Sequence, residues 1–269
     1  MVNPSFLRVE NLSKDFPSPT GKFRAVVRTL QSISLTINKG ETLGLVGESG
    51  CGKSTLGRCL VRLLDPSSGR LFFQGQDITK ISGKPLRDLR RKMQIIFQDP
   101  LASLNPRMTV ALAIEQPLLI HRLLSSREDR RNRVQELAEL VGLRIDQLDR
   151  HPHELSGGQR QRVGIARALA VEPEFIVCDE PVSALDMSIQ AQVLNLLLDL
   201  QQKMGLTYLF ISHDLKVVEH MADRIAVMYL GQIVETAPAQ DLYRRAYHPY
   251  TKALLSAIPS FELKKNRPT

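Results

Sequence analysis

A glycine-rich stretch early in the chain constrains the fold more than any other feature of the sequence. Residues 47–54 read Gly-Glu-Ser-Gly-Cys-Gly-Lys-Ser, which fits the pattern G-x-x-x-x-G-K-[ST]. The apolar run Thr42–Val46 before it predicts a buried strand, and a helix-compatible segment runs from Lys53 to about Leu64 after it. A strand, a tight glycine turn and a helix in this order predict an α/β fold whose loop N–H groups face a phosphate.

This loop also carries the side chains that a nucleotide and its cation require. Its glycines let the backbone curl so that successive N–H groups point at phosphate oxygens. Lys53 is predicted to reach the β- and γ-phosphates of ATP, and the Ser54 hydroxyl to bind Mg²⁺. The alternative is a chance glycine turn, which the flanking strand and helix disfavour. The residues predicted to contact the nucleotide here are Gly47, Glu48, Ser49, Gly50, Cys51, Gly52, Lys53, Ser54 and Thr55.

A second apolar strand ends in two acids. Phe175–Cys178 is followed directly by Asp179 and Glu180. Ligands collect at the carboxyl ends of strands in open α/β sheets, so these carboxylates are predicted to lie near the phosphate loop. Asp179 would then hold Mg²⁺ and Glu180 would polarise an attacking water as general base. Alone, such a pair is more often a solvated loop; the phosphate loop favours the functional interpretation.

The order of the remaining elements predicts a parallel sheet with a helical insertion. Strand-like runs at Gln94–Phe97, Thr207–Ile211 and Arg224–Met228 are separated by helical stretches, as in crossover connections. Between about residues 101 and 155 helix-compatible segments dominate, among them Arg127–Val141 with one apolar face. Ahead of the phosphate loop, residues 7–45 indicate several short strands, including the alternating Ser32–Ile37.

Composition excludes some classes of function. The chain has 269 residues, with 43% hydrophobic and 24% charged, so it can bury a sizeable core. A net charge of +8 suits nucleic acid, but aromatic residues are only 5% and Trp is absent, so stacking platforms for bases are not expected. Its 3 cysteines form no C-x-x-C pair, so we expect neither disulfides nor a structural zinc site. This pattern favours a protein of a reducing compartment. Neither a signal peptide nor an apolar run of roughly 20 residues is visible, so we expect any membrane role to come through a partner.

A third motif predicts a second site for an anion. Leu155–Gln159 reads Leu-Ser-Gly-Gly-Gln, and Ser156 is a plausible N-cap for the helix that follows. A helix start with free N–H groups favours an anion. Because one chain needs only one triphosphate site, we interpret this second site as serving the nucleotide of a neighbouring molecule. The residues predicted to contact it are Ser156, Gly158 and Gln159.

With these motifs in this order, the chain resembles the ATP-binding subunits of ABC transporters. The resemblance implies that Gln98 touches Mg²⁺ and the attacking water, and that His213 contacts the γ-phosphate. It implies that the loop Ser183–Asp186 connects two protomers, and that Phe16 stacks on adenine, with Phe23 as the fallback. Taken singly, Gln98 could be a surface residue, His213 a core histidine and Phe16 ordinary packing. The implied catalytic residues are Lys53, Gln98, Glu180 and His213, and the implied metal ligands are Ser54, Gln98 and Asp179.

The resemblance also implies a fold and a mechanism. The fold is an α/β P-loop NTPase (RecA-like) core with an N-terminal antiparallel β subdomain and an inserted α-helical subdomain. The ATP-binding domain would span residues 6–247, with the helical insertion at about 101–160 and a short tail at 248–269. Two such domains would pack head to tail and enclose two ATP molecules, and opening and closing of this dimer would drive permease subunits in the membrane.

Two further stretches narrow the resemblance to the oligopeptide, dipeptide and nickel importers. These are Phe97–Val110 and His248–Pro259. The resemblance implies a heterodimer with a second ATPase (a homodimer is the alternative), permease subunits and, indirectly, an extracytoplasmic substrate-binding protein. The place of action would be the cytoplasmic face of the inner membrane. No cysteine follows Cys178, so the iron–sulfur cluster of some members is not expected, and the sequence does not identify the cargo.

Other functions are weighed against import. ATPases of DNA repair usually carry long coiled-coil insertions, and those of translation usually carry two such domains in one chain; neither is visible here. An ATPase of a soluble assembly for phosphonate breakdown would retain every motif, including the tail, and stays open as the alternative.

Overall fold

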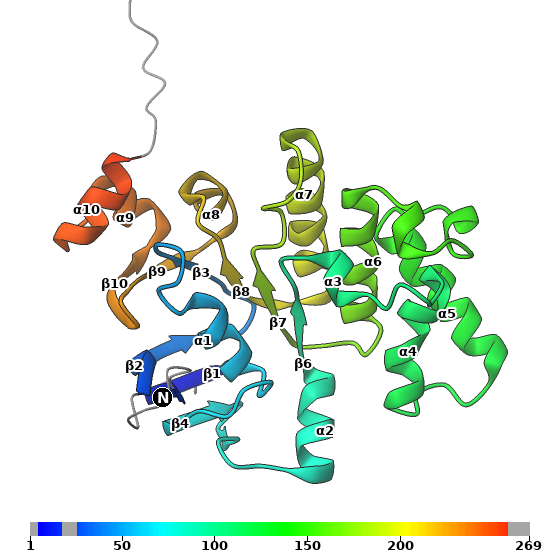
Figure 1. Ribbon diagram of the computed structural model, residues 1–269, viewed down its shortest axis with the longest axis horizontal. Helices are drawn as coiled ribbons and strands as arrows, with labels where there is room; N and C mark the ends of the chain where they lie inside the picture. Colours follow the sequence, from blue (N-terminus) through cyan, green and yellow to red (C-terminus); the bar gives the residue numbers. More distant parts are fainter. Residues whose placement is uncertain (1–4, 18–25, 258–269) are drawn as a thin grey trace, which may run out of the picture.

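The computed structural model describes residues 5–17 and 26–257, which form two β-sheets and a region of helices (Figure 1). This organisation confirms the predicted fold class. The strands are β1 (Leu7–Pro17), β2 (Val26–Ile37), β3 (Thr42–Val46), β4 (Ser68–Phe73), β5 (Gln76–Asp77), β6 (Met93–Ile96), β7 (Phe175–Asp179), β8 (Thr207–Ile211), β9 (Arg224–Tyr229) and β10 (Gln232–Pro238). The helices are α1 (Lys53–Leu60), α2 (Gly83–Lys92), α3 (Pro100–Ser103), α4 (Val110–Ile120), α5 (Arg127–Leu140), α6 (Gly157–Leu169), α7 (Met187–Met204), α8 (Leu215–Met221), α9 (Ala239–Arg244) and α10 (Pro249–Ser256), with short 3-10 turns η1 (Ile145–Gln147) and η2 (Pro152–Glu154).

The N-terminal part of the chain builds an antiparallel sheet in the order β2-β1-β4-β5. Its strands alternate buried and exposed side chains, as expected when only one face of a sheet is covered. The buried side chains of this sheet form one cluster with Leu56 of α1 and with the neighbouring sheet, and they include Leu7, Leu12, Leu30 and Leu71. This sheet therefore closes one side of the phosphate loop and α1.

The second sheet has six strands in the order β10-β9-β3-β8-β7-β6. Its strands are parallel except for β10, which runs antiparallel to β9. Every residue of β3, β7 and β8 is buried, which explains why these strands read as continuous apolar runs rather than alternating ones. Four neighbouring strands, β3, β8, β7 and β6, end at the same edge of this sheet.

All the helical structure between β6 and β7 gathers on one side of the molecule (Figure 1). Here α4 and α5 pack against α6, which also contacts β6 and α7. Arg130 on α5 donates to Glu115 on α4 at 2.8 Å and pairs the two helices by charge. The predicted limits of this insertion, about residues 101–160, and of the ATP-binding domain stay a prediction.

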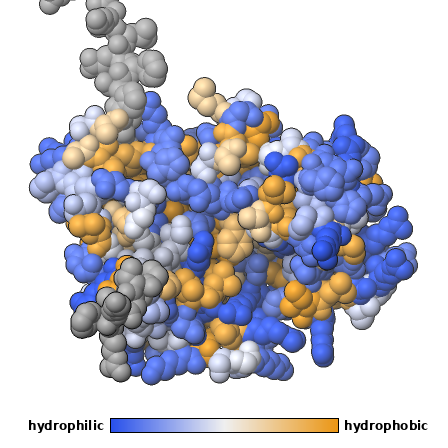
Figure 2. Space-filling model, in the orientation of Figure 1, coloured by the Kyte–Doolittle hydropathy of each residue, from blue (hydrophilic) through white to orange (hydrophobic). Residues whose placement is uncertain are grey.

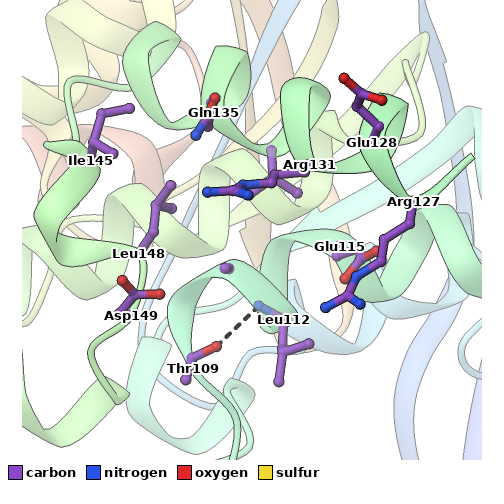
Figure 3. A pocket seen from close by; sticks show the side chains of 12 residues that line it. Thr109, Leu112, Glu115, Arg127, Glu128, Arg131, Gln135, Ile145, Leu148 and Asp149 are labelled. Atoms are coloured by element: carbon purple, nitrogen blue, oxygen red, sulfur yellow. Dashed lines mark hydrogen bonds between the residues drawn. The ribbon is translucent and has the colours of Figure 1, made fainter.

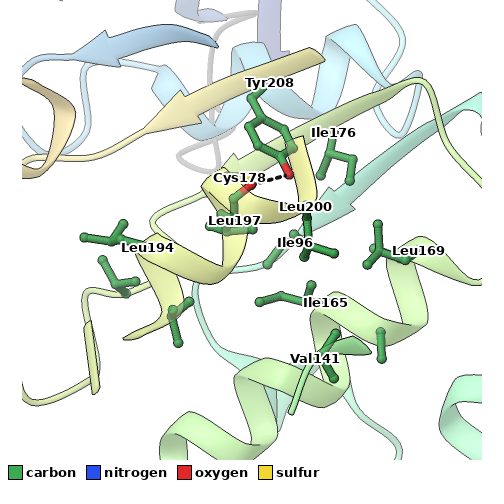
Figure 4. Packing of buried hydrophobic residues seen from close by; sticks show 14 of the residues in the cluster. Ile96, Val141, Ile165, Leu169, Ile176, Cys178, Leu194, Leu197, Leu200 and Tyr208 are labelled. Carbon is green, nitrogen blue, oxygen red and sulfur yellow. Dashed lines mark hydrogen bonds between the residues drawn. The ribbon is translucent and has the colours of Figure 1, made fainter. Parts of the chain in front are cut away.

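The larger apolar cluster joins the parallel sheet to the helical region (Figure 4). Ile96 and Ile176 from the sheet, Ile165 from α6 and Leu197 from α7 all contribute to it. Tyr208 is fully buried there, and its hydroxyl donates to the Leu197 carbonyl at 3.0 Å, which satisfies its one polar group. No helix in the described part of the chain is long and apolar enough to cross a bilayer.

One predicted helix ends earlier than expected. The helix from Lys53 was predicted to reach about Leu64, but α1 stops at Leu60. Arg62 adopts a left-handed backbone (φ 55°), and Leu63 N donates back to the Arg58 carbonyl, as in a Schellman-type ending. The buried Arg62 guanidinium donates to the Ile78 carbonyl and to Asp65, which ties this turn to the segment after β5. A tertiary contact ends the helix, and the local sequence gave no sign of it.

Candidate functional site

Four loops meet where β3, β8, β7 and β6 end. The register places Leu45, Ile211 and Asp179 opposite one another, and Ile96 lies opposite Cys178. The residues that follow these strands are the phosphate loop, His213, Glu180 and Gln98. The parallel sheet thereby brings together groups from residues 47 to 213, as predicted from the strand ends.

The phosphate loop has a backbone that only glycine fits at two places. Gly47 has φ 151°, and a Cβ there would lie 2.1 Å from the Met228 carbonyl oxygen. Gly52 has φ 111°, and a Cβ there would lie 2.7 Å from the Thr29 carbonyl oxygen. Both glycines therefore allow a close approach of backbone to backbone, which holds the loop against β2 and β9.

Lys53 is folded back along this loop. Its Nζ donates to the carbonyl oxygens of Gly47 and Glu48, both at 2.8 Å, and the side chain is 5% exposed. Its charge thus lies against the loop backbone, and a phosphate bound by the loop would lie close to it. The arrangement has the form of an anion cradle.

Ser54 and Asp179 form the part of the site that suits a cation. Ser54 Oγ donates to Asp179 Oδ1 at 2.8 Å, and Asp179 is 2% exposed. Burial raises the pKa of Asp179, although the Ser54 hydrogen bond and the nearby charges of Arg58 and Lys53 oppose this. A buried carboxylate beside a hydroxyl is a hard oxygen donor set, which fits Mg²⁺.

The site offers few oxygen ligands from the protein for a cation. Within residues 5–17 and 26–257, no three His, Cys, Asp or Glu side chains gather in a way that could hold a metal ion. Mg²⁺ commonly takes one or two protein ligands and fills its other positions with phosphate oxygens and water. One buried carboxylate and one hydroxyl, those of Asp179 and Ser54, are within that number and fit a magnesium ion.

Glu180 occupies the centre of the site. Gln98 Nε2 donates to Glu180 Oε2 at 2.9 Å, and His213 Nδ1 lies 3.2 Å from the same oxygen. Glu180 has a left-handed backbone (φ 47°), which is costly for a residue with a side chain. Its N–H donates to the Ile211 carbonyl at 3.0 Å, and the Ser183 hydroxyl donates to its carbonyl at 3.2 Å. These bonds hold the strained turn that aims the carboxylate toward Gln98 and His213.

These groups line a pocket of about 470 Å³. His213 is largely exposed in it, so it is not a core histidine. Thr29 on β2 also lines the pocket, and the sequence gave no signal for it, because a threonine on an alternating strand looks like any surface position. The lining residues are Thr29, Ser49, Gly50, Gly52, Lys53, Ser54, Thr55, Gln98, Glu180 and His213.

The pocket lining leaves out five of the residues predicted to contact the nucleotide: Gly47, Glu48, Cys51, Asp179 and Phe16. Of these, Phe16 is the one that lies outside the phosphate loop and the ends of the parallel strands. It is half-buried near the end of β1, opposite Val27 on β2, and the Lys14 ammonium lies 5.0 Å from its ring centre. Its stacking on adenine stays a prediction. The fallback, Phe23, lies outside the described residues.

The second predicted anion site lies away from this pocket. Ser156 caps α6: its Oγ accepts from Gln159 N at 3.3 Å, and Gln159 Oε1 accepts from Ser156 N at 2.9 Å. A Cβ on Gly158 would lie 2.4 Å from the Ile189 side chain, so the start of α6 packs tightly on α7. Ser156 is exposed, and its hydroxyl hydrogen is left to donate outward because the acceptor side is used by the cap. The exposed Ser156 therefore lies outside the chain's own pocket and is open to a contact with another molecule.

Comparisons of the sequence with protein families match two parts of the chain. Residues 30–183 match the family described as "ABC transporter". Residues 234–269 match the family described as "Oligopeptide/dipeptide transporter, C-terminal region".

Similar proteins and structures agree with these matches. The chain is 57% identical to the oligopeptide transport ATP-binding protein OppF of Bacillus subtilis, over 96% of this chain and 84% of that protein. It is 52% identical to a putative peptide import ATP-binding protein of Brucella ovis, over 97% and 80% of the two chains. The dimeric ATP-binding cassette MJ0796 bound to ADP and Pi superposes with a TM-score of 0.78 at 30% identity, covering 87% of this chain and 98% of that one. CbiO1 of Clostridium perfringens, part of the transporter complex cbiONQ, gives 0.76 at 29% identity, covering 90% and 91%.

Proposed function

The chain belongs to the ABC transporter family of ATP-binding proteins, and we propose that it is the Mg²⁺-dependent ATPase subunit of a peptide importer. The observation that carries the proposal is the meeting of the phosphate loop, Asp179, Glu180, Gln98 and His213 at one sheet edge. The C-terminal match and the peptide-import names of the relatives support peptides, with nickel as the second cargo class.

ATP would bind with its phosphates in the loop and its adenine toward β1. We assign the phosphates to the N–H groups of residues 49–55 and to Lys53, whose Nζ would exchange its two loop carbonyls for phosphate oxygens. We assign the adenine to Phe16, because β1 lies next to β2 and Thr29 of β2 lines the pocket. Stacking of this kind needs no hydrogen-bond pattern from the base.

The magnesium ion would be held by Ser54, Asp179 and Gln98 together with phosphate oxygens. When bound, it neutralises charge on the phosphates and polarises them for attack. The exposed Gln98 side chain is already bonded to Glu180, so a change at Gln98 would reach the general base directly.

Hydrolysis would begin with a water polarised by Glu180. The carboxylate accepts from Gln98 and lies against His213, which leaves its second oxygen to take a proton from the water. The water attacks the γ-phosphorus in line, the bond to the β–γ bridging oxygen breaks, and ADP leaves with inorganic phosphate as products. Lys53 and His213 would stabilise the charge that develops on the γ-phosphate oxygens.

The site is incomplete without a second ATPase subunit. Ser156, Gly158 and Gln159 lie outside the chain's own pocket, and Ser156 at the start of α6 is exposed. We propose that they complete the ATP site of a partner subunit, packed head to tail, and that the partner returns the same contact. A different chain is the partner that the subfamily resemblance implies; a second copy is the alternative.

The permease would dock on the helical region. A groove of about 670 Å³ opens there between α4, α5 and η1 (Figure 3). Leu112 and Ile145 line it and are 45% and 47% exposed, and Arg127 and Arg131 add charge at its wall. An amphipathic cytoplasmic segment of a membrane subunit fits such a groove, so the subunit would work at the cytoplasmic face of the membrane.

The surface of the helical region supports the same assignment. On the face that Figure 2 draws, most side chains are hydrophilic, and some hydrophobic ones gather over the lower part of the helical region. Exposed apolar side chains on and just after α4 include Leu119, Ile120 and Leu124. A partner that covers them would bury apolar surface that a free chain exposes to water.

The substitution Glu180→Gln tests the hydrolytic site. Gln keeps the shape of the side chain but cannot take a proton, so we expect MgATP binding within about threefold of the original and turnover reduced by about 10²-fold or more. Glu219→Gln on α8 is the control, because it is exposed and outside the pocket. Calorimetry gives the binding and phosphate release gives the turnover; undiminished turnover in Glu180→Gln would refute its role as base.

Co-purification from membranes in mild detergent tests the transport role. Membrane permeases and a second ATPase are the expected companions. Soluble carbon–phosphorus enzymes alone would establish the alternative, an ATPase of a soluble assembly for phosphonate breakdown.

A further inference from the structure

The last helix of the described chain reaches the phosphate loop. Tyr250, at the second position of α10, has its hydroxyl oxygen 3.0 Å from the Glu48 N–H, which donates to it. Glu48 is the second residue of the loop, more than 200 positions earlier in the sequence. None of the roles described so far uses this contact.

This hydrogen bond acts on the same peptide unit that holds Lys53. The Glu48 N–H and the Gly47 carbonyl belong to one planar group, which rotates as a whole. Tyr250 binds its N–H, and Lys53 Nζ donates to its carbonyl oxygen at 2.8 Å. Because the two bonds pull on opposite ends of one plane, each polarises the group for the other.

Several contacts hold Tyr250 in place. Its ring lies against Tyr229 at the end of β9, with ring centres 4.3 Å apart. Its backbone N–H donates to His248 Nδ1 at 3.2 Å, so His248 caps the helix whose first residue is Pro249. Burial raises the pKa of Tyr250 above its usual 10.0, so at neutral pH the group at Glu48 is an intact hydroxyl.

Glu235 on β10 fixes the start of this helix. Its two carboxylate oxygens accept from the N–H groups of Tyr247 at 2.8 Å and His248 at 3.0 Å. Burial alone would raise the pKa of Glu235, but these bonds and the Thr251 hydroxyl hold it below its usual value. Each residue of the stretch His-Pro-Tyr-Thr thus has its own role. His248 caps α10 and Pro249 begins it. Tyr250 contacts the phosphate loop, and the buried Thr251 lies against Glu235.

We propose that Tyr250 is a positioning residue for the nucleotide phosphates. Its hydroxyl fixes the orientation of the peptide plane between Gly47 and Glu48. The Gly47 carbonyl of that plane accepts from Lys53, so Tyr250 also determines the position of the Lys53 ammonium before a phosphate binds. The inference rests on the proposed ATPase function and extends it, because it gives the C-terminal segment a part in nucleotide binding. It makes the affinity for nucleotide depend on whether α10 is seated.

The substitution Tyr250→Phe tests this with the loss of one oxygen atom. The ring and its contact with Tyr229 remain, while the Glu48 N–H loses its protein acceptor and hydrogen-bonds to water instead. We expect the Kd for MgADP, which is not consumed, to rise about three- to tenfold in the full chain. In the transporter purified with its membrane subunits, the KM for ATP should rise by the same factor, with kcat within about twofold, since bound phosphates then hold the loop themselves.

Tyr247→Phe is the matched control. It removes a hydroxyl from the same segment, on a residue that is 76% exposed, and should leave the Kd, KM and kcat unchanged. Equal affinities for the original chain and Tyr250→Phe would overturn the inference, as would a fall in kcat at unchanged KM. So would an affinity loss accompanied by a large drop in the midpoint of nucleotide-free thermal unfolding, which would leave only a structural role. If the original chain itself failed to bind MgADP, the proposed function would be wrong, and the two failures are thereby separated.

Discussion

At the scale of single residues, Asp179 carries two opposed requirements. It must be ionised to hold a cation, yet it is buried, and burial raises its pKa. The charged carboxylate therefore lowers the stability of the fold when no nucleotide is bound. Mg²⁺ and the phosphates it accompanies would compensate this charge only on binding.

Replacing Asp179 with Asn should show this cost. An acid whose pKa is raised in the folded state destabilises the fold fully above that raised pKa, and the effect vanishes as the pH falls to its ordinary 3.8. At pH 7 we expect Asp179→Asn to unfold at a higher temperature than the original, by about 2–4 °C for each kcal/mol of relief. The amide oxygen can still accept from Ser54, so packing is preserved. Thermal unfolding without nucleotide measures the difference.

The same variant should lose its response to magnesium. We expect nucleotide binding by Asp179→Asn to change little when Mg²⁺ is added, whereas the original binds more tightly. The gain in thermal stability should shrink as the pH falls toward 4. A variant less stable than the original at pH 7 would contradict this account of Asp179.

Residue roles were predictable from the sequence where a motif dictates them, and not where the backbone does. The spacing of Lys53 and Ser54 after the glycines, together with the position of Asp179 at the end of an apolar strand, predicted that Ser54 and Asp179 share a site. The left-handed φ of Glu180 and the place of Thr29 were not predictable, because both depend on strands that pair only in three dimensions. For Tyr250, the sequence supplied the motif but no role, since its partner Glu48 lies about 200 residues away.

At the scale of elements, the start of α6 combines two tasks in one side chain. Ser156 caps the helix and presents its hydroxyl hydrogen outward. A second helix, α5, is capped in a similar way by Ser126, whose hydroxyl accepts from Glu128 N at 3.1 Å. The two helices therefore allow the cap to be separated from the contact with a partner subunit.

We expect Ser156→Ala and Ser126→Ala to destabilise the fold by a similar amount, about 0.5–2 kcal/mol, through loss of a cap. Only Ser156→Ala should also lower ATP turnover of the transporter purified with its membrane subunits. Because one of the two composite sites fails, we expect about half of the turnover or less to remain. Unfolding in urea measures the first effect and phosphate release the second. Equal turnover in the two variants would argue against a contact of Ser156 with the partner's nucleotide.

Element positions were predicted best where the strand is wholly buried. The predictions for β3 and β8 match their observed bounds, because a short apolar run between turns leaves little choice. The predicted strand Gln94–Phe97 is shifted by one residue, since β6 runs from Met93 to Ile96. The early end of α1 was missed because the contact of Arg62 with Ile78 is tertiary.

At the scale of the whole molecule, the helical groove and the nucleotide pocket are separate surfaces. The groove is lined from α4, α5 and η1, and the pocket from the sheet edge. A change in the groove should therefore affect assembly without affecting nucleotide binding by the free chain.

Leu112→Asp tests this separation. The new charge would have to be buried under a docked permease segment, so we expect the permeases to be lost from the purified complex. Binding of MgATP by the free chain should stay within about twofold, because Leu112 touches no group of the pocket. Leu63→Asp is the control: it too is 45% exposed, and it lies outside the groove. Retention of the permeases by Leu112→Asp would exclude the groove as their docking site.

The architecture was predictable because motif order restricts it. Alternating strands and helices with a helical stretch in the middle predict a parallel sheet with an insertion, and the observed strand order agrees. What the sequence could not predict is the groove itself. Its walls come from side chains on three separate helical segments whose packing angles are set by their shared core.

Because β3, β8, β7 and β6 are neighbours in one sheet, the distances between their carboxyl ends are fixed. Neighbouring strands are spaced at roughly 4.8 Å, so the four strand ends span on the order of 14 Å. Lysine, histidine, acid and glutamine are therefore ordered along that length by backbone hydrogen bonds that no ligand has to form. Because the strands are hydrogen-bonded to one another, the spacing and the order of these four groups stay fixed during a catalytic cycle. Movement that does work on a membrane partner must arise beyond these strand ends, where the chain leaves Gln98 for the helical region or meets a second subunit.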